Sequence, residues 1–149
     1  MKLTDRDIEI IRYLEEDSRM SLRHIAGELD VSPTTVSNRV QKMKEEGVIE
    51  KFGLKLNLGE LNYSLTAIIK VKAKSDDLSK VLEEMEAYPC LTHIYETTGD
   101  FDVIGIGKFK SREEMTDKLV DLVQSPHIET TNTSLVLSTL REYDNSGLV

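Results

Sequence analysis

The spacing of apolar side chains changes near residue 64, and this change divides the chain into two parts. Before it, apolar residues recur every three or four positions, which is the period of an amphipathic helix. After it, stretches that alternate every second position indicate strands, and two further helical stretches interrupt them. The pattern predicts an α+β chain with a helical N-terminal region and a C-terminal region of mixed structure.

Two short helices joined by a tight turn are predicted between Ser21 and Gly47. Ser32 is the expected N-cap of the second helix, Pro33 its first helical residue, and Gly47 the residue beyond its end. A preceding helix, opened by Thr4, supplies the third side of a small core. This arrangement is typical of a helix-turn-helix domain.

The second of these helices carries a polar, lightly basic face opposite its apolar stripe of Val36, Val40 and Met43. Hydroxyl, amide and cationic side chains can read base edges and bind phosphates in a major groove that admits one helix. The DNA contacts predicted for this helix and its N-cap are Ser32, Thr34, Thr35, Ser37, Asn38, Arg39 and Lys42.

Within this set, Asn38 and Thr35 are the expected base readers, and Arg39 and Lys42 the expected phosphate contacts. Arg39 has an alternative role, an ion pair inside the domain with an acid such as Asp7. The alternative for the whole segment is a three-helix packing unit whose polar face is merely solvated.

The formal net charge of −8 is unevenly distributed along the chain. Residues 1–60 carry ten Lys and Arg against twelve Asp and Glu, whereas residues 61–149 carry nine against fifteen. Residues 19–44 include five basic side chains and only two acidic ones. Because one such patch neutralises few phosphates, we expect a dimer or a larger assembly to be needed on a duplex.

Alternating residues 48–56 predict a strand that leads out of the helical region, and the Gly and Asn residues of 57–62 predict a linker. The expected boundaries are a helix-turn-helix domain over residues 1–50, a strand and linker over 51–63, and a second domain over 64–149.

The second domain has the order strand, helix, strand, strand, helix, strand. The predicted ranges are 65–74, 76–88, 91–98, 101–109, 111–124 and 131–142. This βαββαβ order is that of the ferredoxin-like fold, a four-stranded antiparallel sheet with both helices on one face.

Its strands are apolar on both sides. Ile104 and Ile106 alternate with Val103 and Phe109, and Val136 lies in the last strand. Helices can cover only one face, so the other is predicted to pack against a second copy of the chain. Such a two-fold dimer would present two recognition helices to two half-sites. The alternative is a sheet richer in β-branched residues than its exposure requires.

Composition favours a soluble, cytoplasmic protein without a metal or cofactor. No apolar run in the 149 residues is long enough to span a bilayer, and no signal peptide is visible. The single cysteine, Cys90, excludes an internal disulfide framework and is expected to be a small buried hydrophobe. His24, His93 and His127 have no metal-ligand spacing.

One set of residues, in this order along the chain, resembles the Lrp/AsnC regulators, also called feast/famine regulatory proteins. The set is Leu3, Asp7, Ile10-Ile11, Leu14, Arg19, Ser32, Arg39-Val40, Gly47-Val48-Ile49 and Thr98-Gly99-Asp100-Phe101-Asp102. The resemblance covers essentially the whole chain. It implies a regulator of transcription with a winged-type DNA-binding domain, partnered by double-stranded DNA, and a C-terminal domain that senses an amino acid. It also implies homodimers that assemble into larger rings.

The resemblance places the effector at the Thr98–Asp102 turn, at an interface between dimers. In that turn Gly99 can expose N–H groups to an α-carboxylate, and Asp100 or Asp102 can pair with an α-ammonium group. Alternatively the segment is an ordinary hairpin turn. The complete set of expected effector contacts is Thr98, Gly99, Asp100, Asp102, Thr131 and Thr133.

Two other functions are compatible with the same two-domain layout. Relatives that decarboxylate tetrapyrroles would need convergent histidines and arginines, and the C-terminal domain offers only His93, His127, Arg112 and Arg141 in acidic surroundings. An amino-acid-binding protein without DNA binding would not require the polar face of the second helix.

Overall fold

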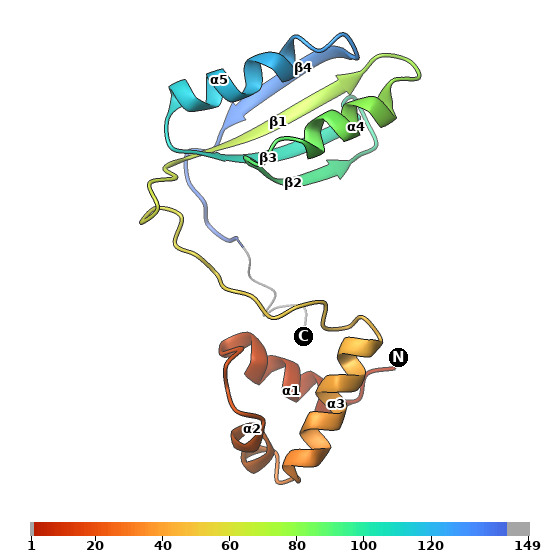
Figure 1. Cartoon of the computed structure of the whole chain (residues 1–149), viewed down its shortest axis with the longest axis vertical. Helices are drawn as coiled ribbons and strands as arrows, with labels where there is room; N and C mark the ends of the chain where they lie inside the picture. Colours follow the sequence, from red (N-terminus) through yellow and green to blue (C-terminus); the bar gives the residue numbers. More distant parts are fainter. Residues whose placement is uncertain (1, 143–149) are drawn as a thin grey trace. The chain divides into compact units, whose positions relative to one another are not determined.

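The computed structural model describes residues 2–142, and two compact units with separate hydrophobic cores make up the chain (Figure 1). Residues up to Lys55 belong to the first unit, and Leu56–Leu140 form the second. The linker residues before the change in apolar spacing therefore fold with the C-terminal unit. No helix within residues 2–142 is long and apolar enough to cross a membrane.

Three helices build the N-terminal unit within the described residues, namely α1 (Asp5–Glu16), α2 (Leu22–Glu28) and α3 (Pro33–Glu45). The hydroxyls of Thr4, Ser21 and Ser32 each accept a backbone N–H from the first turn of the helix that follows, which confirms the helix starts predicted at Thr4 and Ser32. The apolar stripes meet in one core of Ile10, Leu14, Ile25, Ala26, Val36, Val40 and Met43.

Helix α3 ends where the sequence predicts, because Gly47 adopts a φ of +73° that L side chains rarely tolerate. The N–H of Val48 donates to the carbonyl of Met43 at 2.8 Å, and the N–H of Gly47 donates to the carbonyl of Lys44 at 3.1 Å. These two bonds form a Schellman motif, which satisfies the last carbonyls of the helix.

The C-terminal unit has the predicted βαββαβ order. Its elements are β1 (Leu65–Ala73), α4 (Leu78–Glu86), β2 (Leu91–Glu96), β3 (Val103–Phe109), α5 (Arg112–Val123) and β4 (Ile128–Leu135). The strands form an antiparallel sheet in the order β2-β3-β1-β4, with both helices on one side (Figure 1). Ile69, Val71 and Val103 of the sheet pack with Val81 of α4 and Leu119 of α5 in the core between them.

The predicted ends of the last strand are wrong. Strand β4 covers Ile128–Leu135 rather than residues 131–142. It pairs with β1 from Ala73 back to Ala67, and the N–H of Val136 makes a final bond to the carbonyl of Thr66. Strand pairing stops there because β1 itself begins at Leu65.

The strand predicted over residues 48–56 is absent from the described chain, which has no regular structure there. A strand needs hydrogen-bonding partners, and no other strand pairs with this segment. Its alternating apolar side chains are open to solvent, with Leu54 84% and Leu56 59% exposed. The prediction of a strand over residues 48–56 is therefore wrong for the single chain.

Candidate functional site

The outward face of α3 is a continuous polar surface. Thr34, Ser37, Asn38, Gln41 and Lys42 are all exposed and recur every three or four residues, so their side chains share one side of the helix. Val36 and Met43 are fully buried on the opposite side. We call Thr34, Ser37, Asn38, Gln41 and Lys42 the reading face.

Gln41 is the member of the reading face that the predicted DNA contacts omit. Its amide donates to Glu45 at 2.8 Å along the helix. The signal that identifies it is its spacing of three residues from Asn38, which places both amides on the same face.

Ser32 and Thr35 occupy the N-terminal end of α3 and bond to each other. Their hydroxyl oxygens are 2.8 Å apart, and the N–H of Thr35 donates to the Ser32 hydroxyl at 3.1 Å. Ser32 is exposed and Thr35 half-buried. The Ser32 hydroxyl therefore caps the helix, and the Thr35 hydroxyl, in the first turn, is bonded to it.

Arg39 lies at the edge of the core and forms an ion pair with Asp7 of α1, which is the alternative left open by the sequence. Its Nε–H donates to Asp7 Oδ1 at 2.7 Å, and its Nη2 donates to Asp7 Oδ2 and to the hydroxyl of Thr4. The Asp7 side chain is 0% exposed and the Arg39 side chain 28% exposed. Arg39 thus differs from Lys42, which extends into solvent.

The pKa of Asp7 reflects these contacts. Burial alone would raise the pKa, but the bonds from Arg39 and Thr4 outweigh it and lower the pKa from 3.8 to about 2. Asp7 is consequently ionised in the folded protein at neutral pH, and it needs its donors because a buried carboxylate without them is costly.

We expect the stabilising contribution of Asp7 to be lost in acid. Because the pKa is lower in the folded state, this contribution is present above about pH 4 and disappears as pH falls toward about 2, for a total of about 2 kcal/mol. The measurement is the free energy of unfolding of wild type and Asp7→Asn from neutral pH into this acid range. A gap between the two proteins that stays constant throughout would contradict the assignment.

The turn between β2 and β3 is held by both backbone and side-chain bonds. The N–H of Thr97 donates to the carbonyl of Asp102 at 2.8 Å, and Gly99 adopts a φ of +118°. One oxygen of the Asp102 carboxylate accepts the N–H of Ala73 at 2.8 Å, which ties the turn to the end of β1. Asp102 is therefore part of the framework, whereas Thr98, Gly99 and Asp100 are exposed.

The predicted effector residues fall into two groups within one chain. Thr131 and Thr133 lie directly opposite Val71 and Ile69 of β1, so both side chains are on the same face of β4. Strands β3 and β4 lie on either side of β1. The backbones of β3 and β4 are therefore two strand spacings, or about 10 Å, apart. The turn and the two threonines thus lie on opposite sides of β1.

The sheet face that faces away from the helices has an apolar centre. Ile68 and Ile106 are directly paired across β1 and β3, and Ile104 is paired with Tyr95 of β2. These positions alternate with the buried core residues, so their side chains are on the other side of the sheet. We call Ile68, Tyr95, Ile104 and Ile106 the free-face patch. Tyr95 is 50% exposed and the three isoleucines are half-buried.

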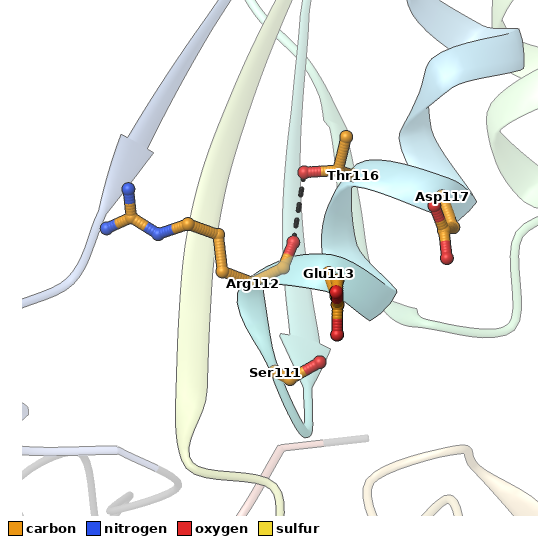
Figure 2. A pocket seen from close by; sticks show the side chains of 5 residues that line it. All are labelled: Ser111, Arg112, Glu113, Thr116 and Asp117. Atoms are coloured by element: carbon orange, nitrogen blue, oxygen red, sulfur yellow. Dashed lines mark hydrogen bonds between the residues drawn. The ribbon is translucent and has the colours of Figure 1, made fainter.

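A hollow lies at the first turn of α5, where Ser111, Arg112, Glu113, Thr116 and Asp117 line it (Figure 2). Its charged side chains are of both signs and point in different directions. It follows β3, whereas the β2–β3 turn precedes that strand. None of the residues that line the hollow is a predicted effector residue.

Comparison with known protein families matches both units. The model "Winged helix-turn-helix DNA-binding" matches residues 3–50, and the model "Lrp/AsnC ligand binding domain" matches residues 66–145. An HTH-type transcriptional regulator of Pyrococcus furiosus is 38% identical over 142 residues, which cover 95% of this chain and 96% of that protein.

Solved structures share the fold over nearly the whole length. AsnC of E. coli has a TM-score of 0.92 at 25% identity, covering 97% of this chain and 98% of its own. A regulator of Neisseria meningitidis, solved as its L-methionine complex, has a TM-score of 0.88 at 19% identity, with 99% and 100% covered.

The helix-turn-helix unit and the ferredoxin-like unit occur here in the order and extent found in these relatives. The enzyme alternative is excluded, because the matching families and relatives are regulators. The chain belongs to the Lrp/AsnC family and is a transcriptional regulator with a helix-turn-helix DNA-binding domain and an Lrp/AsnC ligand-binding domain.

Proposed function

We propose that this regulator binds double-stranded DNA sequence-specifically through the reading face of α3. The observation that carries the proposal is that five exposed hydroxyl, amide and ammonium side chains share one face of a helix whose other face is fixed in a core. Asn38 and Gln41 can donate to and accept from a base edge, and Lys42 can bind a phosphate. Ser32 and Thr35 add hydroxyl groups at the N-terminus of the helix, where phosphates bind favourably.

Two substitutions separate base readout from phosphate binding. Asn38→Ala should reduce the free energy of binding to a preferred duplex by about 1 to 3 kcal/mol, because it removes an amide that reads a base. It should leave binding to unrelated DNA unchanged. Lys42→Ala should weaken binding evenly and lower the slope of log affinity against log salt by about one. Fluorescence anisotropy over a salt series measures both.

The matched control is Lys80→Ala, which removes the same charge from α4 in the other unit. It should leave both affinities and the salt slope at their wild-type values. If Asn38→Ala and Lys42→Ala also bind every duplex like the wild type, the reading face has been assigned wrongly.

The functional unit we propose is a homodimer joined mainly through the free-face patch. Isoleucines on the uncovered side of a sheet are stabilised when a second apolar surface removes them from water. The alternating segment 48–56 supplies a second contact near the N-terminal units, because a copy of itself would provide the missing strand partner. Such a dimer, and the larger assemblies built from it, would bring two reading faces to one duplex.

We propose that a small effector, a free amino acid, binds at the exposed part of the β2–β3 turn. Gly99 leaves the backbone accessible, and the Asp100 carboxylate is free of the framework role that Asp102 has. Thr131 and Thr133 would complete the site when contributed by a neighbouring copy, since they lie across β1 in the same chain. The match to an Lrp/AsnC ligand-binding domain supports a small-molecule ligand.

A panel of the twenty amino acids tests this site by thermal shift, because a ligand that binds only the folded state raises the melting temperature. We expect one or a few to stabilise the wild type and the response to be lost in Asp100→Asn. Asp121→Asn, an exposed carboxylate on α5, is the control and should respond like the wild type. An Asp100→Asn protein that responds fully would remove this residue from the site.

A further inference from the structure

A single buried carboxylate joins α1 to the middle of α3. The backbone N–H and the hydroxyl of Thr4 both donate to Asp7 Oδ2 at 2.8 Å, and Arg39 donates to both carboxylate oxygens. Both oxygens of Asp7 are therefore engaged, by Thr4 at the start of α1 and by Arg39 of α3, which is 32 residues from Asp7 in the sequence. A planar guanidinium paired in this way fixes direction as well as distance.

Arg39 lies between a buried residue and a reading residue. Val40, on one side of it, is part of the core, and Asn38, on the other, is exposed on the reading face. Because neighbouring residues of a helix are held in a fixed angular relation, a bond that fixes Arg39 also fixes the direction in which Asn38 points. Base readout demands such placement, since its amide bonds must meet one base edge.

We propose that Arg39 is a positioning residue for DNA recognition, whose paired bonds to Asp7 set the rotation of α3 and so aim Asn38 at its base. The proposal rests on the DNA binding proposed above. In this role the Arg39 guanidinium does not bind a DNA phosphate. Sequence discrimination then depends on the geometry of the Asp7–Arg39 pair, whereas the attraction to any duplex does not.

The test uses the full chain and two duplexes of equal length, one enriched by the wild-type protein from a randomised library and one with the same bases scrambled. Anisotropy over a salt series gives the affinities of wild type, Arg39→Lys, Asp7→Asn and Thr4→Val. Circular dichroism defines the temperature range in which each variant is folded. Thr4→Val removes a hydroxyl donor and leaves the ion pair, so it remains informative if Asp7→Asn does not fold.

Arg39→Lys keeps the charge and loses the paired geometry. It should therefore weaken binding to the enriched duplex by about tenfold and to the scrambled duplex by less than about twofold, with an unchanged salt slope. Asp7→Asn and Thr4→Val should shift the ratio of the two affinities in the same direction. Lys42→Gln is the control that lowers the slope by about one and keeps the ratio.

Three results would overturn the proposal. The first is the behaviour of a phosphate contact: Arg39→Lys would bind both duplexes like the wild type, because lysine also binds a phosphate. Asp7→Asn would then bind both duplexes more tightly and with a steeper salt slope, because it releases the Arg39 guanidinium. A purely structural pair would lower the melting temperature and leave the ratio of affinities unchanged in all variants. In the third, the wild type enriches no duplex, and the proposed DNA binding itself fails. That result differs from one in which the wild type enriches a duplex and the variants bind it with the same affinity.

Discussion

Replacing Ile106 by Lys is expected to abolish the homodimer that we propose. Ile106 is at the centre of the free-face patch, directly opposite Ile68, and two-fold symmetry would place two new ammonium groups in one apolar interface. Each uncompensated charge should cost about 3 kcal/mol or more, which is enough to abolish association at micromolar concentration. Sedimentation velocity measures the change.

Val123→Lys is the matched control, because Val123 is also an exposed apolar side chain, 51% accessible, but lies on α5 on the other side of the unit. It should sediment like the wild type. Circular dichroism must show the Ile106→Lys monomer to be folded, as its half-buried position allows. A folded Ile106→Lys protein that remains dimeric would remove the free-face patch from the interface.

Arg39→Ala is expected to destabilise the N-terminal unit selectively. It leaves the Asp7 carboxylate, which is fully buried, without its cation, and breaking one partner of a buried pair costs about 3 to 5 kcal/mol. Hydrogen exchange read peptide by peptide should therefore show amides of α1 and α3 exchanging at least about a hundredfold faster. Peptides from the sheet should keep their wild-type protection, because they belong to a separate core.

Arg19→Ala provides an internal comparison, since Arg19 pairs with Asp17 at 3.6 Å on the surface, where the side chains are 86% and 49% exposed. Surface pairs contribute about 0 to 1 kcal/mol, so exchange in this variant should stay close to that of the wild type. Equal rates for Arg39→Ala and Arg19→Ala would show that the buried pair adds nothing to the stability of the unit.

Local sequence signals predicted the helices of the N-terminal unit well. The three cap hydroxyls and Gly47 act within a few residues of where they stand, so the helix ends they specify need no knowledge of the tertiary fold. The order of elements in the second unit follows in the same way from the period of the apolar positions.

Features that depend on distant partners could not be predicted in the same way. Strand β4 ends where β1 begins, which its own residues do not encode. The alternating segment 48–56 forms no strand, because no strand of the described chain pairs with it. Strands β2 and β3 are also shorter than predicted, since β2 ends at Glu96 and β3 begins at Val103, and the Asp102 carboxylate bonds to Ala73 of β1, which lies 29 residues away in the sequence.

The candidate site shows the same limit. Spacing along the helix is enough to identify the reading face, but it does not reveal that Arg39, among the cations of α3, is paired with a buried acid. Asp7 and Arg39 are 32 residues apart, and only the packing of α1 against α3 brings them together. Likewise, no local pattern indicates that Asp102 is engaged in the framework while Asp100 remains exposed.

Selection of duplexes from a randomised library by the wild-type protein, read by sequencing after several rounds, tests sequence-specific DNA binding most directly. We expect one motif to be enriched, made of two inverted half-sites whose centres are about one helical turn or a small multiple of it apart. The Asn38→Ala protein should fail to enrich the same motif. A wild-type pool that stays indistinguishable from the input library, or one that Asn38→Ala reproduces, would contradict the proposed reading face.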